Sequence, residues 1–265
     1  MISAFVITAD DDPVILRATL AAARWVDELV LVDKGRRYSV IKPGEPGIRV
    51  VQKEWSPTVE ETRVFALAQT KHEWVVCLDA DEILSPACEA VFRGFFADGS
   101  TDVLFVPIHH YLLGRRNKLP FAWPEWRPCL FRRGAVEYGQ TVHAGTRVIG
   151  TSRVLDADSV AHLTHLSSPD VATYVEKINR YTSRPERSGV GVPPAGSLRE
   201  WAVVELQKYG SPSGIWGADD YCDAAALLRG LYDVVDGLKR WEATQPDARE
   251  VYAEMARDAV ERCSS

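Results

Sequence analysis

The sequence predicts an α/β protein, with a mostly parallel sheet flanked by helices and with a helical C-terminal region. The first observation is an alternation of short apolar strands and amphipathic helices, which is typical of βαβ units. The second is that carboxylates follow directly after three of the predicted strands. The third is the last quarter of the chain, where apolar residues recur at helical spacing.

The opening residues form the first predicted βαβ unit. The stretch Ile2 to Thr8 is rich in β-branched and aromatic residues, which favours a central strand. Pro13 can begin the helix after the acidic turn, and the second strand, Glu28 to Val32, is followed by Asp33. Because strand, helix and strand fit within about 30 residues, they are expected to pair in parallel with a right-handed crossover.

A third strand, a second helix and a fourth strand follow. The third strand is predicted over Ile48 to Val51, and the helix over Val59 to Thr70. The consecutive apolar residues Trp74 to Leu78 then predict a strand that is buried on both faces. Such a strand belongs in a parallel sheet that helices cover on both sides.

Three carboxylates, Asp79, Asp81 and Glu82, crowd the end of this fourth strand. Such a cluster repels itself, and it is kept mainly where a cation neutralises it, usually a divalent metal with oxygen ligands. Ser85 and Pro86 are expected to be the N-cap and first residue of the next helix, so that the carboxylates lie in a short turn. The alternative is a solvated acidic turn.

The carboxylates after the predicted strands are expected to meet. They lie in the segments Asp10 to Asp12, Asp33, and Asp79 to Glu82. The carboxyl ends of parallel strands share one edge of the sheet, and in open α/β sheets ligands bind at that edge. The convergence therefore favours a site for a metal and a nucleotide over three unrelated solvated turns.

The α/β pattern continues with a helix over Pro86 to Phe96 and a strand over Val103 to Ile108. From Tyr111 the chain becomes rich in arginine, tryptophan and proline, which predicts an irregular segment before a strand at Pro128 to Phe131. Aromatic rings and arginines can stack on sugars or bases and pair with phosphate. The alternative is that the tryptophans of this segment, Trp123 and Trp126, only pack a loop.

The histidines have two possible roles. His143 lies in the stretch GQTVHAG, and His162 and His165 lie in VAHLTHL, which closes a predicted strand. A single histidine is more often a core residue than a ligand. His165, however, ends a strand at a place where the acidic cluster calls for a further metal ligand.

Composition limits the protein class. The chain of 265 residues is 46% hydrophobic, which is enough to build the core of one main domain. Its net charge of −6 and pI of about 5.6 give no overall positive charge that would attract nucleic acid. Five cysteines lie far apart without metal spacing, which fits a reducing compartment. The N-terminus lacks signal-peptide features, and no apolar run approaches the roughly 20 residues that span a bilayer. These features predict a soluble, cytoplasmic protein, with peripheral membrane contact left open.

The C-terminal helices are predicted over 219–243 and 247–262, after a helix that ends at Gly210. Their apolar positions include Leu227, Leu228, Leu231 and Val235. Packing explains this stripe most simply. An amphipathic surface could also contact a membrane or a second copy of the chain in a homodimer.

With these residues laid out, the chain resembles the family-2 glycosyltransferases of the GT-A fold, in particular the branch that includes the lipopolysaccharide-core glucosyltransferases. The likeness extends from the opening strand to about Glu242. It rests on ISAFVITADDD, WVDELVLVDKG, the arginine of EETRVFALA, WVVCLDADE, RPCLFRRG, the VH of TVHAG, and HLSSPDVATYVEKINRY. It implies a GT-A core over 1–168, with a nucleotide-sugar half over about 1–108 and an acceptor half over about 109–168, and a helical region over 169–265.

The resemblance implies a nucleotide-sugar donor, most often a UDP-sugar, held with manganese or magnesium at the edge of the sheet. On this pattern, Thr8 and Asp10 line the nucleotide pocket. Asp33 accepts a hydrogen bond from the uracil, and Asp79 bonds the ribose hydroxyls. The donor is expected to react with a hydroxyl-bearing acceptor.

The resemblance also implies the metal ligands. Asp81 would ligate the metal that bridges the diphosphate, and His165 matches a histidine that completes the metal's ligands. Arg63 would face the diphosphate or brace the loop. The physical logic agrees, since charge builds on the leaving phosphate as the sugar bond breaks, and a metal stabilises that charge.

One departure from the family pattern concerns the general base. Relatives usually have V-H-E where this chain has Val142, His143 and Ala144, and that glutamate is the natural candidate to deprotonate the acceptor. Glu125, Glu137 and His143 are the nearest substitutes by sequence, and we expect Glu125 to serve, with His143 as the second candidate. A carboxylate beside tryptophans can have its pKa raised toward the working pH, as a general base needs.

Three functions compete at this point. The first is an inverting glycosyltransferase. A sugar-phosphate nucleotidyltransferase should carry a glycine-rich, basic loop after the first strand, which TADDD is not. A non-catalytic nucleotide-sugar-binding protein is supported only by Ala144. For the transferase, a saccharide, a natural product or a hydroxymethylated base in phage DNA would be a possible acceptor, and the acidic pI disfavours the last.

Overall fold

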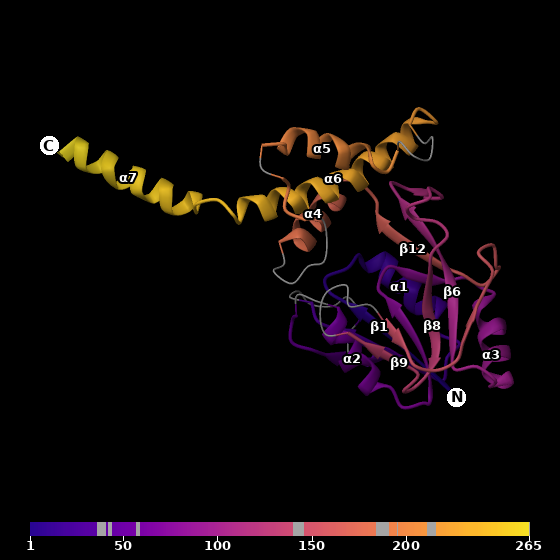
Figure 1. Cartoon of the computed structure of the whole chain (residues 1–265). Helices are drawn as coiled ribbons and strands as arrows, with labels where there is room; N and C mark the ends of the chain where they lie inside the picture. Colours follow the sequence, from indigo (N-terminus) through magenta and orange to yellow (C-terminus); the bar gives the residue numbers. More distant parts are fainter. Residues whose placement is uncertain are drawn as a thin grey trace. The chain divides into compact units, whose positions relative to one another are not determined.

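The computed structural model describes residues 1–35, 41, 44–56, 59–139, 146–183, 191–194, 196–210 and 216–264. The chain divides into two compact units, unit 1 over Met1–Val171 and unit 2 over Ala172–Ser265. Figure 1 labels their helices and several of their strands.

Unit 1 contains a mixed sheet with helices on both faces (Figure 1). Its elements are, in chain order, β1 (Ile2–Thr8), α1 (Pro13–Ala22), β2 (Glu28–Asp33), β3 (Arg49–Gln52), α2 (Glu60–Gln69), β4 (Trp74–Asp79), β5 (Glu82–Leu84), α3 (Cys88–Asp98), β6 (Val103–Leu112), β7 (Arg115–Arg116), β8 (Trp126–Arg132), β9 (Val136–Tyr138), β10 (Thr146–Val148), β11 (Ser152–Val154) and β12 (Leu163–Ser168).

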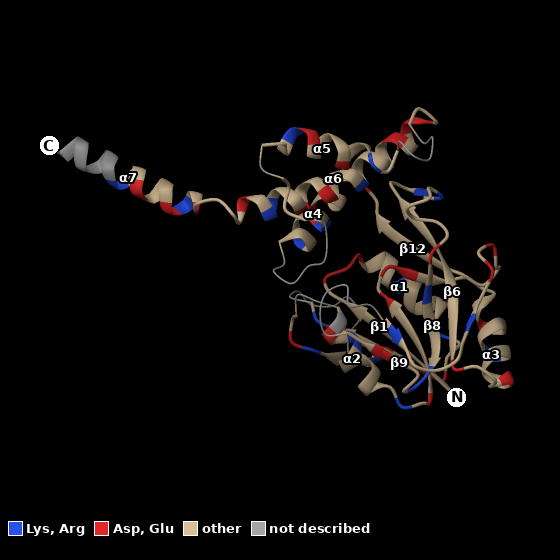
Figure 2. Cartoon of the chain, in the orientation of Figure 1, with Lys and Arg blue, Asp and Glu red and all other residues tan. Residues whose placement is uncertain are grey.

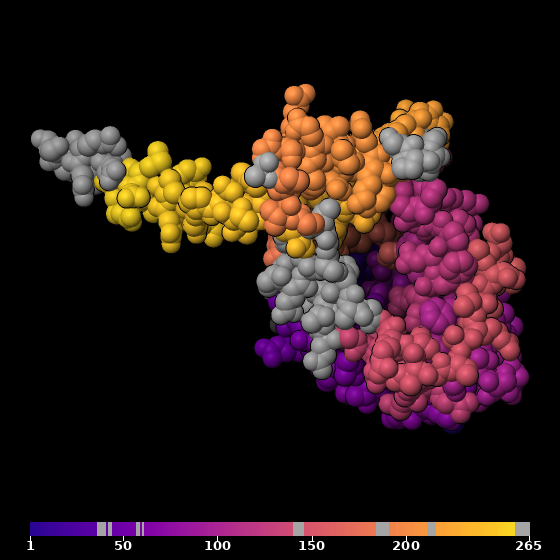
Figure 3. All heavy atoms as spheres, viewed as in Figure 1, coloured from indigo at the N-terminus to yellow at the C-terminus, as the bar shows by residue number. Residues whose placement is uncertain are grey.

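The strands of the main sheet lie in the order β3-β2-β1-β4-β8-β6-β12-β5, and β7 and β11 pair with β6. β3, β2, β1 and β4 are parallel neighbours, and β12 is parallel to β6. β8 is inserted antiparallel between β4 and β6. The exposed strand β11 lies on the outer surface of unit 1, in the salmon segment of Figure 3.

The two faces of the sheet explain the unbroken apolar strands. All residues of β1 are buried. Ala4 and Val6 belong to a core cluster with residues of α1 and α3, whereas Phe5 and Ile7 belong to a second cluster with Ala66 of α2. Helices therefore cover both faces, as the sequence predicted for an α/β protein.

The segment after the acidic triplet differs from the prediction. Glu82–Leu84 forms the short strand β5, antiparallel to β12, and α3 begins at Cys88 rather than at Pro86. Ser85 caps no helix, because its hydroxyl donates to the carbonyl of Val160 (2.7 Å) and accepts from the amide of His162 (3.1 Å). Pairing with a strand distant in the sequence overrides the local capping pattern.

Unit 2 is helical, with α4 (Val171–Thr182), α5 (Leu198–Gln207), α6 (Asp220–Glu242) and α7 (Ala248–Ser264). α5 and α6 pack closely, since a Cβ on Gly230 would lie 2.8 Å from the carbonyl oxygen of Glu205. The described side chains of α7 are exposed, and Figure 2 shows residues of both charges along it. Within the described residues, no helix has the length and apolar character needed to cross a bilayer.

His109 on β6 is buried in a cluster of rings. It stacks on His162 with ring centroids 3.9 Å apart, and its edge meets Trp123 at 5.1 Å. The guanidinium of Arg116 lies over Trp123 at 4.7 Å. Burial, followed by the nearby charges of His162 and Arg116, lowers the pKa of His109 from 6.5 to about 4.

The lowered pKa of His109 predicts that the folded protein loses stability as the pH falls. Between pH 6.5 and about 4 the unfolded chain binds a proton at His109 that the folded chain rejects, so the free energy of unfolding should fall across this range as pH drops. The loss is expected to reach roughly 3 kcal/mol. His109→Phe should flatten the dependence, which urea unfolding at several pH values would measure. An equally steep loss in the variant would contradict the assignment.

Candidate active site

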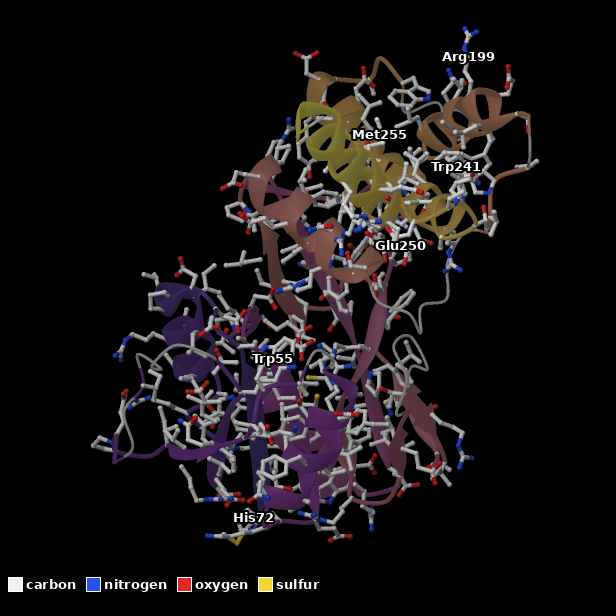
Figure 4. The ribbon with its side chains drawn as sticks, turned by 90° about the vertical axis from the view of Figure 1, so that its left-hand side faces the viewer. Trp55, His72, Arg199, Trp241, Glu250 and Met255 are labelled. Atoms are coloured by element: carbon white, nitrogen blue, oxygen red, sulfur yellow. The ribbon has the colours of Figure 1, made fainter. Side chains whose placement is uncertain are left out.

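The parallel strands bring the predicted acidic residues to one edge of the sheet. The register pairs Thr8 with Asp33 across β1 and β2, and Ile7 with Asp79 across β1 and β4. The acidic turn between β1 and α1 is visible as a red segment in Figure 2. Trp55, which follows β3, marks this edge in Figure 4, and His72, which precedes β4, marks the opposite edge.

The turn after β1 uses two of its three aspartates for structure. Asp11 accepts hydrogen bonds from the Thr8 hydroxyl (3.0 Å) and the Ala9 amide (2.8 Å). Asp12 accepts from the first amides of α1 and so caps that helix. Asp10 has a left-handed backbone with φ of 63°. The left-handed backbone of Asp10 thus lies between β1 and the two aspartates that close and cap the turn.

Asp33 lies beside Asp10 and is buried. Its Oδ1 accepts from the Gly35 amide (2.9 Å), and its Oδ2 accepts from the Gln52 side chain (3.2 Å). A Cβ on Gly35 would lie 2.8 Å from Oδ1 of Asp10 and 3.1 Å from Oδ1 of Asp33. The two carboxylates thus flank Gly35, where a side chain would not fit.

Two arginines neutralise the acidic cluster after β4. Arg63 donates to Oδ2 of Asp79 (2.7 Å), and Arg127 donates to the same oxygen (3.4 Å) and to Glu82. The Asp79 amide donates to Glu82 (2.8 Å). The sequence suggested a metal as the neutralising cation, but at Asp79 and Glu82 the neighbouring cations are guanidinium groups. The sequence placed Glu82 in the acidic cluster, but it gave no sign that Arg127 neutralises it.

The network shifts both carboxyl pKa values, in opposite directions. Burial alone would raise the pKa of Asp79, but the charges of Arg63 and Arg127 outweigh it and hold this pKa at about 2. For Glu82 burial prevails over Arg127, and the pKa is raised. Within the described residues, Oδ1 of Asp79 is buried without a hydrogen-bond partner. Asp79 therefore keeps one acceptor atom for a ligand donor.

Asp81 and His165 lie close enough to share a cation. Oδ2 of Asp81 is 3.4 Å from Nε2 of His165, and the amide of Leu166 donates to the Asp81 carbonyl (2.9 Å). One carboxylate oxygen and one imidazole nitrogen suit manganese. The described residues contain no group of three or more His, Cys, Asp or Glu that could hold a metal ion. A metal here would need further ligands from phosphate and water.

His165 also belongs to a chain of hydrogen bonds that the sequence did not predict. Its Nδ1 is 2.8 Å from Nδ1 of His110, whose Nε2 is 2.9 Å from Oε2 of Glu125. Glu125 is half-exposed, with 55% of its side chain accessible. The hydrogen bond from His110 lowers the pKa of Glu125 more than burial raises it. The expectation of a raised pKa for Glu125 is therefore wrong.

The tryptophans beside Glu125 pack against protein. Trp126 donates from its indole to the Leu155 carbonyl (2.8 Å), and Trp123 packs against His109. Glu137 on β9 pairs with Arg147 on β10 (2.9 Å), and 55% of the Glu137 side chain is exposed. His143 and Ala144 lie outside the described residues.

The comparison with known proteins identifies the family. Residues 3–160 match the family model "Glycosyl transferase family 2", so the chain belongs to this family and is a glycosyltransferase. The predicted glycosyltransferase family 2 and the predicted α/β fold, a mostly parallel sheet flanked by helices, are confirmed.

The chain is similar to two "uncharacterized glycosyltransferases". The protein from Rickettsia felis is 27% identical over 192 residues, which cover 69% of this chain and 68% of that protein. The protein from Rickettsia bellii is 27% identical over 191 residues, which cover 68% and 65%. The matches thus span about two thirds of these relatives' lengths.

Solved structures of TarS from S. aureus are also similar. TarS 1–349 in complex with UDP has a TM-score of 0.45 at 12% identity and covers 91% of this chain and 90% of its own. The complex of TarS 1–349 with UDP-GlcNAc has a TM-score of 0.44 at 13% identity and covers 91% and 89%.

Proposed function

We propose that this glycosyltransferase is a metal-dependent, inverting enzyme that moves a sugar from a nucleotide-diphosphate donor to an acceptor hydroxyl. The donor we propose is a UDP-sugar. The observation that carries the proposal is the pair Asp81 and His165, side by side at the carboxyl edge of the sheet. A carboxylate and an imidazole at this edge can hold manganese or magnesium against the phosphates of a donor.

The nucleoside end of the donor is proposed to bind near β1 and β2. Asp33 is buried and held in place by Gly35 and Gln52, so its carboxylate is a rigid acceptor for a base N–H. Asp10 flanks the same glycine, and Thr8 braces the turn through Asp11. Asp79 offers Oδ1 to the ribose hydroxyls.

The diphosphate is proposed to lie between this acidic edge and the metal. When bound, the metal would stabilise the charge that builds on the leaving phosphate. Arg63 lies at the same edge, but its contact with Asp79 supports a bracing role more than a direct phosphate contact. We place the donor half over about 1–108 and the acceptor half over about 109–168, and the acceptor deprotonation at Glu125, with His143 as the second candidate.

The test of the metal site is Asp81→Asn. We expect the variant to fold normally and to lose manganese-dependent UDP affinity by more than the roughly 10- to 100-fold typical of outer-shell changes, because a metal ligand is removed. Calorimetric titration of UDP with and without manganese measures this. Asp98→Asn is the matched control, since Asp98 is half-exposed and pairs with Arg153. UDP affinity unchanged in Asp81→Asn would refute the site.

The remaining features of the proposal concern the acceptor and the setting. Motif resemblance favours the branch that includes lipopolysaccharide-core glucosyltransferases, with a saccharide or natural-product acceptor. A hydroxymethylated base in phage DNA is disfavoured by the net charge of −6.

Slow hydrolysis of a UDP-sugar without acceptor would separate a working transferase from a protein that only binds the donor. Cytoplasmic location, peripheral membrane contact and a homodimer through the C-terminal helices stay predictions.

A further inference from the structure

His110 is a partly buried polar side chain, 18% exposed, and it has no role in the proposed chemistry. It lies on β6, next to His109, but the two rings face different partners. His109 stacks on His162, whereas His110 bridges His165 and Glu125. Strand register explains the bridge, because β6 and β12 pair His110 directly with His165.

The short contacts determine where the protons lie. An ionised Glu125 can only accept, so the proton of its 2.9 Å contact belongs to Nε2 of His110. In a neutral His110 ring, Nδ1 then carries the lone pair. The 2.8 Å contact between the two Nδ1 atoms needs one proton, which His165 must supply.

This assignment fixes the other nitrogen of His165. A neutral His165 with its proton on Nδ1 has its lone pair on Nε2, the nitrogen that lies 3.4 Å from Oδ2 of Asp81. Two electron-rich atoms at this separation repel each other unless a cation lies between them, which is a metal ion in the loaded site or a proton on Nε2 in the metal-free protein. In the opposite tautomer, Nε2 would carry a proton and could not ligate a metal.

We propose that His110 is a positioning residue, which, supported by Glu125, holds His165 in the tautomer whose Nε2 can ligate a metal together with Asp81. This inference rests on the proposed function, since it assigns the orientation of the same metal site. It gives Glu125 an orienting contact through Oε2, separate from any proton transfer at its other oxygen.

The first test needs no metal. Nitrogen NMR of the full chain with ¹⁵N-labelled histidine, at a pH where both rings are neutral, should show His165 protonated on Nδ1 and His110 protonated on Nε2. His110→Phe keeps a ring but removes the acceptor, so His165 should lose its uniform Nδ1 tautomer. His110→Asn should retain it, because the amide oxygen can replace Nδ1 as acceptor.

The second test measures manganese binding in the presence of UDP. His110→Phe should weaken manganese affinity by roughly 10- to 100-fold, as is typical when the partner of a ligating histidine is removed. His110→Asn should restore most of the affinity. His72→Phe is the matched control at the opposite edge of the sheet (Figure 4), and it should bind manganese like the wild type.

The results distinguish a failure of the proposed role of His110 from a failure of the metal site itself. A wild-type His165 protonated on Nε2, or wild-type manganese affinity in His110→Phe, would overturn the role of His110. Absence of manganese binding in the wild type would refute the metal site of the proposed function, while the tautomer measurement would still decide whether His110 orients His165. If His110→Phe does not fold, the wild-type tautomer and His110→Asn still decide.

Discussion

Replacement of Arg127 by methionine is expected to lower the free energy of unfolding by about 3–5 kcal/mol. The Arg127 side chain is 15% exposed and contacts Asp79, Glu82 and Cys77. Its loss would remove the guanidinium that pairs with Glu82, which is 4% exposed, and would leave Arg63 as the guanidinium that contacts Asp79 among the described residues. An uncompensated buried charge is among the most destabilising single changes.

Urea unfolding at neutral pH would measure the effect. Arg147→Met is the matched control, because Arg147 pairs with Glu137 at the protein surface and 69% of the Arg147 side chain is exposed. Arg147→Met should lower the free energy of unfolding by less than about 1 kcal/mol. Adding Glu82→Gln to Arg127→Met should restore part of the lost free energy of unfolding, since it removes the carboxylate that no longer has Arg127 as its partner. Equal costs for Arg127→Met and Arg147→Met would show that the network carries no net stability.

Replacement of Glu125 by glutamine is expected to slow sugar transfer by about 100- to 10,000-fold, the usual cost of losing a general base. Binding of UDP-sugar and manganese should stay close to that of the wild type. Glutamine can still accept the hydrogen bond from His110 through its carbonyl oxygen, so His165 keeps its orientation. The substitution therefore separates proton transfer from positioning.

Steady-state transfer rates and donor titrations on the same preparation test this expectation. The lowered pKa of Glu125 makes it a weaker base than the sequence suggested, so the wild-type rate should fall only at low pH as this carboxyl is protonated. A wild-type rate in Glu125→Gln would eliminate Glu125 as the base. Glu137→Gln and His143→Ala would then test the two remaining candidates.

Local pattern was enough to predict the N-terminal half of the fold. β1, β2 and β4 follow the predicted ranges within a residue or two, and α1 begins at the predicted Pro13, because strands buried on both faces and helices with one apolar face have distinct periods. Parallel topology follows from the βαβ order, and it places strand ends at one edge. The position of Asp10, Asp33 and Asp79 at that edge was therefore readable from the residues alone.

Contacts between distant segments decided the rest of the site. β8 lies beside β4, and this brings Arg127 to Asp79 and Glu82 across more than forty positions. β12 lies beside β6, which sets His165 against His110. Neither pairing has a local signal, because strand partners are selected by the packing of the whole sheet. The protonation of Glu82 and Glu125, and the tautomer of His165, depend on these partners and so were decided only by the tertiary structure.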